Sequence, residues 1–427
     1  MIRGPLDPTA AAALAGRFPR SVALVNLDAL AFNVRALLRE VGPGVRLMAV
    51  VKANAYGHGA VPVAIAALRA GASMLAVAGV DEGIQLRQAG ITAPVLLLGA
   101  TPPAEMGRTV AHQLTPTVCD VEAAAALQAA AAAAGLPRVA LHVKVDSGLH
   151  RFGVSAAEAV AFVDWLAEQP RLRVEGLYTH FSSAEEADGQ ATRREYACFA
   201  AVVAALRARG SRPLLHAANS AATLGFPSYR LDMVRVGLAL YGLAAGYPGG
   251  QRLSQWPVLE IHGRIGRVHS LAAGEAVGYG RTYIAPAPRR VALVSIGYAD
   301  GFRRALSNRG QVLVNGRRAA VLGRVSMDQI VVDVTGAGAV GAGDLATVLG
   351  RQGEDEITAA EMAGWIDGIP HEVVATLGAR LPRAYVQRGR LVGVSDLLGD
   401  HQLAAGPDDQ IFRWPVAAPG ASVASGS

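Results

Sequence analysis

Lysine is the residue that this chain most clearly lacks. Only two of its 40 basic residues, Lys52 and Lys144, are lysines, and the rest are arginines. Where positive charge alone is needed the chain uses arginine, so a lysine indicates chemistry that a guanidinium cannot perform. A primary amine forms a Schiff base with an aldehyde or a carbamate with carbon dioxide, whereas arginine stays protonated and does neither. Chance survival of two lysines is the alternative, and it weakens because both lie in motifs described below.

Cysteine, long apolar runs and clustered charge are also scarce. Cys119 and Cys198 are far apart and fit neither a disulfide framework nor a zinc site. No stretch approaches the roughly 20 apolar residues of a membrane-spanning helix, and the Ala-rich segment 10–15 is too short for a signal peptide. The net charge of +6 is interleaved with acidic residues rather than gathered in a basic run. We therefore expect a cytoplasmic protein with no metal, membrane or nucleic-acid partner.

The apolar residues that are present, 52% of 427, suffice for two domains. From Val45 to Val236, short apolar runs alternate with amphipathic or Ala-rich segments, which is typical of parallel βα units. The eight candidate strands are Val45–Val51, Ser73–Val77, Pro94–Leu98, Thr115–Val118, Val139–Val145, Val174–Tyr178, Leu214–Ala217 and Met233–Val236. One intervening helix has clear ends, with Asp120 as its cap and Gly135 then Pro137 as its stop. Eight such units predict an α/β fold of the (β/α)8 barrel type.

After about Pro257 the pattern changes to the alternation of antiparallel strands. Asn315-Gly316 lies between two alternating runs and predicts a tight hairpin. A mostly β C-terminal domain is therefore expected to follow the barrel. We assign residues 1–21 to an N-terminal extension, 22–257 to the barrel, 258–390 to the β-rich domain and 391–427 to a tail. That tail is rich in Ala, Pro, Gly and Ser from about Gly406, and we expect it to be poorly ordered.

The unusual residues fall at one rim of the predicted barrel. Catalytic groups of such barrels come from the carboxyl ends of strands, and a phosphate site commonly follows strands seven and eight. The residues at these ends are Lys52, Lys144, His180, Asn219, Ser220, Arg235 and Gly237. The Ser220 hydroxyl and the N–H groups of Gly237 and Leu238 suit a phosphate dianion. Taken singly, Gly237 would be interpreted as a turn residue and Asn219-Ser220 as a helix cap. The presence of Lys52 on the same rim favours their interpretation as a phosphate site.

The run from Val50 to Gly59, VVKANAYGHG, closely resembles the cofactor-lysine signature of alanine racemases. Further matches in the family's order are Lys144–Gly148 running into Arg151, Tyr178–Phe181, Asn219-Ser220, Arg235–Gly242, Val277–Gly280, Ile296–Gly301 and Gly323–Gln329. The resemblance covers roughly residues 22–388. It implies a pyridoxal 5'-phosphate enzyme that interconverts L- and D-alanine and supplies D-alanine for peptidoglycan.

The resemblance also implies two proton-transfer groups. Lys52 is the lysine that holds the cofactor and serves the D-alanine face, and Tyr279 serves the L-alanine face. Two groups are needed because a single base would mostly return the proton to the face that it left. His180 matches a histidine that the family pairs with this tyrosine. If Gly278-Tyr279-Gly280 stood alone, we would interpret Tyr279 as an ordinary turn aromatic.

The remaining site residues are carried over from the same resemblance. Arg235 matches the donor to the pyridine nitrogen, and its permanent charge disfavours protonation of that nitrogen. Arg151 matches a contact to the phenolic oxygen and the substrate carboxylate, and the Met327 N–H matches a second carboxylate donor. Lys144 matches a lysine that is often carbamylated and orients the arginine. The residues that match contacts to the phosphate or its surroundings are Tyr56, Asn219, Ser220, Gly237, Leu238 and His371.

Two departures from the family pattern stand out. Ser326 replaces a common cysteine, and we expect little effect because the contact there is the next residue's N–H. His371 replaces a common tyrosine at the site entrance, where a smaller imidazole could still bond the phosphate but would reshape the pocket. A racemase that also accepts serine is therefore an alternative. Substrate range and carbamylation of Lys144 stay open.

The family resemblance implies a head-to-tail homodimer in which Tyr279 and Met327 reach the partner's barrel. Dimer affinity and the role of the tail stay open. A decarboxylase of the same fold group is disfavoured because such enzymes usually place an acidic residue where this chain has Arg235. A non-catalytic pyridoxal phosphate carrier is disfavoured because carriers resemble the barrel alone.

Overall fold

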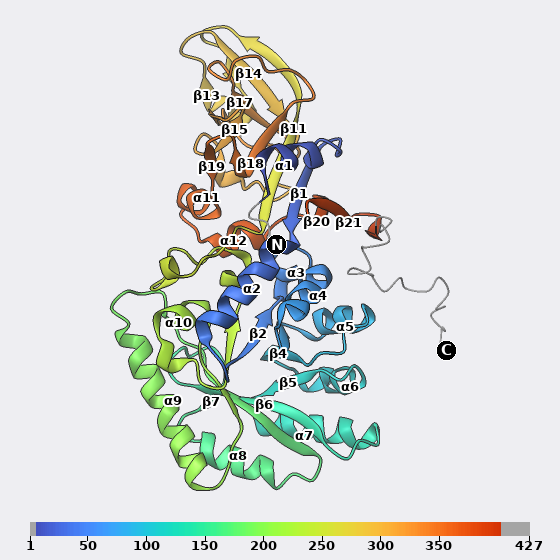
Figure 1. Cartoon of the computed structure of the whole chain (residues 1–427), viewed down its shortest axis with the longest axis vertical. Helices are drawn as coiled ribbons and strands as arrows, with labels where there is room; N and C mark the ends of the chain where they lie inside the picture. Colours follow the sequence, from blue (N-terminus) through green and yellow to red (C-terminus); the bar gives the residue numbers. More distant parts are fainter. Residues whose placement is uncertain (1–5, 403–427) are drawn as a thin grey trace.

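A computed structural model of the chain describes residues 6–402 and shows two parts stacked along the long axis of the molecule (Figure 1). One part is a parallel sheet surrounded by helices, and the other is a mostly antiparallel β domain. The predicted fold class, a (β/α)8 barrel followed by a mostly β C-terminal domain, is confirmed.

The barrel strands lie side by side in the order β10-β2-β3-β4-β5-β6-β8-β9, and neighbouring strands in this order are parallel. Their bounds are β2 (Arg46–Val50), β3 (Met74–Val77), β4 (Val95–Ala100), β5 (Thr115–Val118), β6 (Val139–Asp146), β8 (Leu172–Tyr178), β9 (Leu214–His216) and β10 (Met233–Val236). Backbone hydrogen bonds from Asp232 N to Leu215 O (3.1 Å) and from Arg235 N to Ala218 O (2.9 Å) join β9 to β10. All eight predicted strands are present, and each carries mostly buried residues in the sheet.

Helices follow the strands and cover the barrel (Figure 1). They are α2 (Leu27–Val41), α3 (Lys52–Tyr56), α4 (Ala60–Ala70), α5 (Val80–Gln88), α6 (Met106–Ala111), α7 (Val121–Ala133), α8 (Ala159–Ala167), α9 (Gln190–Ala208) and α10 (Ser220–Gly225). The predicted cap of α7 is present, since the Asp120 carboxylate accepts a 2.7 Å hydrogen bond from Ala123 N. A short strand, β7 (Val154–Ser155), pairs with β6.

The β domain is built on a sheet with the order β16-β15-β18-β11-β1-β20-β21-β22, to which β14, β17 and β19 are attached. Its elements are β1 (Ser21–Asn26), β11 (Leu259–Leu271), β12 (Ala276–Val277), β13 (Tyr283–Ile284), β14 (Arg289–Val294), β15 (Gln311–Val314), β16 (Arg317–Ala320), β17 (Ile330–Asp333), β18 (Leu345–Gln352), β19 (Asp355–Ile357), α11 (Ala359–Trp365), α12 (Pro370–Ala375), β20 (Arg383–Gln387), β21 (Arg390–Asp396) and β22 (Gly399–Gln402). The predicted hairpin joins β15 to β16, with φ of 51° at Asn315 and 71° at Gly316. Positive φ at both turn residues is what a type I′ hairpin requires.

Near both ends of the chain, the structure places segments differently from the predicted domain boundaries. We assigned residues 22–257 to the barrel, but β1 pairs antiparallel with β11 and parallel with β20 of the β domain. Every residue of β1 is buried. Its sequence therefore shows no alternation of apolar and polar residues that would assign the strand to either domain. The N-terminal extension contains α1 (Pro8–Ala15), whose Ala11 and Ala15 pack against that sheet. The predicted tail, 391–427, begins with strand residues in β21 and β22, and its part from residue 403 lies outside the described residues.

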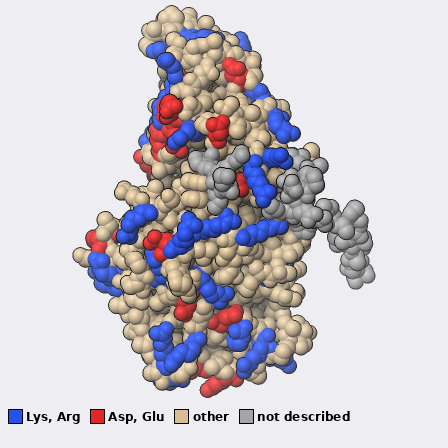
Figure 2. All heavy atoms as spheres, viewed as in Figure 1, with Lys and Arg blue, Asp and Glu red and all other residues tan. Residues whose placement is uncertain are grey.

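The face drawn in Figure 2 carries both basic and acidic side chains on each of the two domains. Among residues 6–402, no helix is both long and apolar enough to cross a membrane.

The cap of α7 offers a test of the fold. Asp120→Ala should lower the free energy of unfolding by about 1 kcal/mol, because Ala123 N loses its acceptor. Equilibrium urea denaturation measures the change. Asp120→Asn keeps an acceptor oxygen and should stay close to the parent protein, so equal losses in the two variants would contradict the capping role.

Candidate active site

A cavity of about 560 Å³ opens where the barrel strands end. The structure brings together around it the predicted residues Lys52, Tyr56, Lys144, Arg151, His180, Asn219, Ser220, Arg235, Gly237, Leu238 and His371. The barrel residues converge because the carboxyl ends of parallel strands share one rim, so residues distant in sequence become neighbours. His371 lines the same cavity from α12 of the β domain. Their individual roles stay predictions.

The chain turns in an unusual way directly after β2. Ala53, Asn54, Ala55 and Tyr56 all have φ of 52–53°, which makes one left-handed turn of four L-residues. Each such residue costs roughly 1–2 kcal/mol because its Cβ approaches the following carbonyl. Gly57 ends the turn at φ 79°, where an added Cβ would collide with the Val374 carbonyl. Such strain persists where surrounding contacts fix the backbone, and it is common at functional sites.

Both lysines of the chain line the cavity. Burial, followed by the charge of Arg151, lowers the pKa of the Lys52 amine. Lys144 is buried, donates to the Phe152 carbonyl and lies 4.5 Å from the centre of the Phe152 ring. Burial also lowers the pKa of Lys144. A lowered pKa increases the fraction of uncharged amine at neutral pH, which is the nucleophilic form.

The guanidinium of Arg235 is buried at the base of this site. Its Nη1 donates to His216 Nδ1 and to the His216 carbonyl, both at 3.0 Å. Its Nη2 lies within hydrogen-bond distance of the carbonyls of Thr179 (2.8 Å) and Ala217 (3.0 Å) and of His180 Nδ1 (3.1 Å). Within residues 6–402, Arg235 Nε has no hydrogen-bond acceptor. The Nε–H group is therefore available to a ring nitrogen in the cavity. Burial lowers the pKa of Arg235 to about 10, so it stays charged at neutral pH.

The imidazoles around Arg235 are held neutral. Burial, and then the charge of Arg235, brings the pKa of His180 and of His216 well below the usual value. Arginine can only donate, so we assign Nδ1 of each ring as the acceptor and Nε2 as the protonated nitrogen. His216 Nε2 then donates to His142 Nδ1 at 2.9 Å. In this assignment His180 keeps its Nε2–H for a further partner.

Hydroxyl and N–H groups form a cradle after β9 and β10. The backbone N–H groups of Gly237 and Ala239 donate to Ser220 Oγ at 3.1 Å and 3.3 Å. A Cβ added at Gly237 would collide with the Tyr56 hydroxyl, so the tyrosine approaches this backbone closely. Burial raises the pKa of Tyr56, which keeps it a protonated donor. The His371 ring lies 5.9 Å from the Tyr56 ring.

This donor set fits pyridoxal phosphate. The cradle suits a phosphate, Lys52 offers an amine for the aldehyde, and Arg235 Nε offers a donor for the pyridine nitrogen. The cavity volume lies within the roughly 300–1,000 Å³ of small-molecule sites.

Tyr279 and Met327 lie elsewhere. Both belong to the β domain and are exposed, Tyr279 to 74% and Met327 to 51%. In the described part of the chain, neither lines the barrel cavity. Exposed large apolar side chains of this kind indicate a contact surface. One chain alone therefore does not bring Tyr279 to Lys52, and the roles of both residues stay predictions.

Two residues beside Arg235, Tyr178 and His216, were given no role from the sequence. Tyr178 stacks on His216, with ring centres 4.7 Å apart and 9° between the planes, and Arg235 lies 5.0 Å above the Tyr178 ring. Both Tyr178 and His216 end barrel strands, so their position on the rim was the signal that could have found them.

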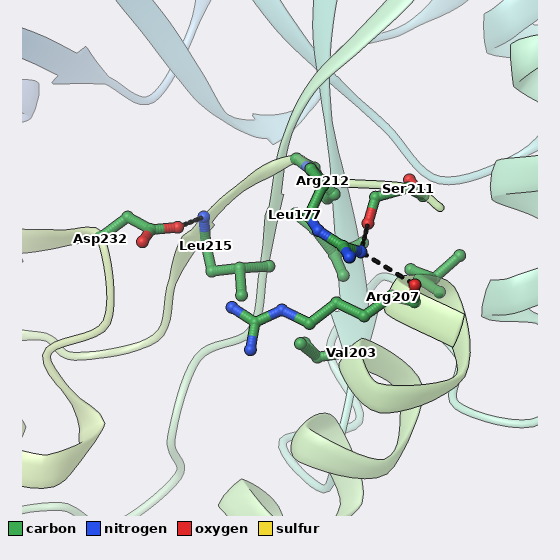
Figure 3. A pocket seen from close by; sticks show the side chains of 9 residues that line it. Leu177, Val203, Arg207, Ser211, Arg212, Leu215 and Asp232 are labelled. Carbon is green, nitrogen blue, oxygen red and sulfur yellow. Dashed lines mark hydrogen bonds between the residues drawn. The ribbon is translucent and has the colours of Figure 1, made fainter. Parts of the chain in front are cut away.

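A smaller cavity of about 230 Å³ lies between α9 and the start of β9 (Figure 3). Its lining includes Leu177, Arg207, Arg212 and Asp232, and none of the predicted site residues. Arg212 donates to the carbonyl of Arg207 at 2.8 Å, and Asp232 accepts from Leu215 N at 2.7 Å. These bonds hold the loop before β9, so we interpret this region as structural. Among the described residues, no group of His, Cys, Asp and Glu has an arrangement that could hold a metal ion.

Comparisons with known proteins agree with this geometry. Residues 25–245 match the family model of the alanine racemase N-terminal domain, and residues 258–385 match that of the C-terminal domain. An alanine racemase of Nostoc sp. is 42% identical over 368 residues, which are 85% of this chain and 95% of the relative. Alanine racemase 2 of Bacillus subtilis is 41% identical over 383 residues, covering 87% and 96%.

Solved structures are similar over the same length. The alanine racemase of Bacillus anthracis with bound L-Ala-P has a TM-score of 0.83 at 36% identity, covering 89% of this chain and 99% of that one. The alanine racemase of Bartonella henselae with covalently bound pyridoxal phosphate has a TM-score of 0.78 at 27% identity, covering 86% and 100%.

The cradle makes a prediction about Gly237. Gly237→Ala should weaken pyridoxal phosphate binding by about tenfold, because the new methyl displaces the Tyr56 hydroxyl and removes a charge-assisted hydrogen bond. Titration of the cofactor-free protein, followed by visible absorbance, measures the affinity. Gly246→Ala is the matched control, since its Cβ meets nothing within 4 Å. Equal affinities in the two variants would show that the phosphate does not bind here.

Proposed function

The chain belongs to the alanine racemase family, and from this premise we propose that it interconverts L- and D-alanine with pyridoxal 5'-phosphate. We further propose that the D-alanine, made in the cytoplasm, supplies peptidoglycan. The observation that carries the proposal is the convergence of an amine of lowered pKa, a phosphate cradle and the buried Arg235 guanidinium on one cavity.

Binding of the cofactor is divided among three groups of residues. Lys52 supplies the amine for its covalent attachment. Ser220, Tyr56 and the N–H groups of Gly237 and Leu238 hold the phosphate, with Asn219 and His371 beside them. Arg235 donates Nε–H to the pyridine nitrogen. When bound, pyridoxal phosphate withdraws electrons from the substrate Cα–H bond and so makes that proton removable.

Lys52 and Tyr279 move the proton on opposite faces of the substrate. The lowered pKa of the Lys52 amine increases its uncharged fraction. This amine takes or returns the proton on the D-alanine face. The Tyr279 phenol of a second subunit serves the L-alanine face. Arg235 keeps a cation at the pyridine nitrogen, which disfavours its protonation and limits side reactions of the deprotonated substrate.

The substrate carboxylate is held by Arg151 and the Met327 N–H. Burial lowers the pKa of the Lys144 amine most, and the Arg151 charge lowers it further because the two cations repel each other. If Lys144 Nζ adds to carbon dioxide and loses a proton, the carbamate anion attracts Arg151 instead. Carbamylation would therefore orient Arg151 for the carboxylate.

A head-to-tail homodimer completes each site in this proposal. It is supported by the exposure of Tyr279 and Met327 on the β domain and by the position of the other site residues around the barrel cavity. Each site then combines Lys52 of one subunit with Tyr279 of the other.

Two inactive variants test the shared site and the racemase function together. Lys52→Ala and Tyr279→Phe should each abolish most racemisation of L- and D-alanine, because one proton group is missing. Their purified heterodimer, obtained with two affinity tags, holds one intact site and should regain about half of the parent activity. Tyr283→Phe, on the neighbouring strand β13, is the control and should stay active.

Three outcomes of that experiment would count against the proposal. Parent protein that inverts neither alanine nor serine would refute the racemase function. A Tyr279→Phe homodimer as active as the Tyr283→Phe control would refute the second proton group. An inactive heterodimer would refute the shared site.

A racemase that also accepts serine is the second candidate, and His371 favours it. The imidazole lines the cavity where a larger tyrosine is common, and burial lowers its pKa, so it is mostly neutral at pH 7. His371→Tyr should raise the ratio of kcat/KM for alanine over serine by about tenfold, because the extra volume excludes the hydroxymethyl group. An unchanged ratio would mean that residue 371 does not set the specificity.

A further inference from the structure

The carboxylate of Glu82 links the loops that follow two neighbouring barrel strands. Its Oε1 accepts a 2.6 Å hydrogen bond from Ala53 N, directly after Lys52 and β2. Its Oε2 accepts from Ala78 N at 2.6 Å and from Gly79 N at 3.3 Å, directly after β3. Hydrogen bonds from backbone N–H groups to a carboxylate are short and strong because the acceptor is charged. Glu82 therefore fixes the first peptide after Lys52 to the end of β3.

That peptide begins the left-handed turn. Within the turn, Ala55 N donates to Val51 O at 2.8 Å and Gly57 N donates to Ala53 O at 3.0 Å. The Ala53 N–H instead has the Glu82 carboxylate as its acceptor. Ala53 is also the first residue that must hold a positive φ, at 52°. The bond to Glu82 thus acts where the chain leaves the conformation that an L-residue prefers.

We propose that Glu82 is a positioning residue, which holds the left-handed turn and so aims the Lys52 amine at the cofactor and substrate. The proposal rests on the proposed function in that Lys52 is the cofactor lysine. Glu82 acts through Ala53 and is absent from the described lining of the cavity, so it does not touch the reacting atoms.

Glu82 also acts on Lys52 through its charge. The carboxylate raises the pKa of the Lys52 amine, against burial and the Arg151 cation, which both lower it. The other titratable groups that interact with Lys52 are His180 and His371, whose pKa values are themselves lowered. If the Glu82 charge were removed, burial and the Arg151 cation would lower the pKa of the Lys52 amine without opposition.

The test compares Glu82→Ala with Asp81→Ala in the full-length protein. Asp81 is the adjacent carboxylate of α5, is exposed and pairs with Arg108. Loss of the charge-assisted bond at Ala53 should slow covalent attachment of pyridoxal phosphate to Lys52 about tenfold in Glu82→Ala, as followed by visible absorbance. In the same variant, kcat for racemisation should fall about tenfold while KM for alanine changes less than about twofold, because Arg151 is untouched.

Glu82→Gln covers the case in which Glu82→Ala does not fold. Glutamine keeps the chain length and one acceptor oxygen but loses the charge, so attachment should slow by about threefold, between the parent and the alanine variant. Attachment rates in Glu82→Gln and Glu82→Ala equal to that of Asp81→Ala would overturn the proposal, as would a rise in KM with kcat unchanged.

The same measurements separate this inference from the proposed function. Slow attachment in the Glu82 variants of a protein whose parent inverts no amino acid would support the positioning role and refute the racemase function. Normal attachment in the variants of an active parent would refute the positioning role alone.

Discussion

The buried guanidinium of Arg235 is the constraint on which the chemistry of the cavity depends. A charge in the interior requires hydrogen-bond acceptors, and here three backbone carbonyls and two imidazoles supply them. This charge also affects its neighbours, because a second positive charge on His180 or His216 would be repelled by Arg235. Burial and Arg235 together therefore keep both imidazoles neutral. Their tautomers are then fixed, because an arginine can only donate. The site therefore presents a defined pattern of donors before any ligand binds.

The barrel completes only one side of the proposed reaction. It supplies Lys52, the phosphate cradle and Arg235, while Tyr279 and Met327 lie exposed on the β domain of the same chain. The β domain is nevertheless fixed to the barrel, since Arg383 Nε of β20 donates to the Gly57 carbonyl at 3.1 Å, at the end of the turn that follows Lys52. A second copy can therefore present its Tyr279 from a rigid support, which is what proton transfer at one defined face requires.

The sequence predicts those features that depend on local pattern. Barrel strands are short, mostly apolar segments, and residues at their carboxyl ends share a rim by topology, so Lys52 and Arg235 could be placed together in advance. The position of β1 could not, because a fully buried strand carries no alternation. The left-handed turn was equally hidden, since Ala53, Asn54 and Ala55 are ordinary L-residues. The role of Glu82 appears only when two loops meet around its carboxylate.

The scarcity of lysine now has a physical explanation at the site. Burial lowers the pKa of arginine and lysine alike, but from different starting values. Arg235, although buried, keeps a pKa of about 10 and stays a cation at neutral pH. The pKa of the Lys52 and Lys144 amines is lowered from a smaller ordinary value, so burial brings them nearer to the uncharged form. In the proposed function Lys52 and Lys144 react as uncharged amines, a role that arginine could not take, and both lysines line this cavity.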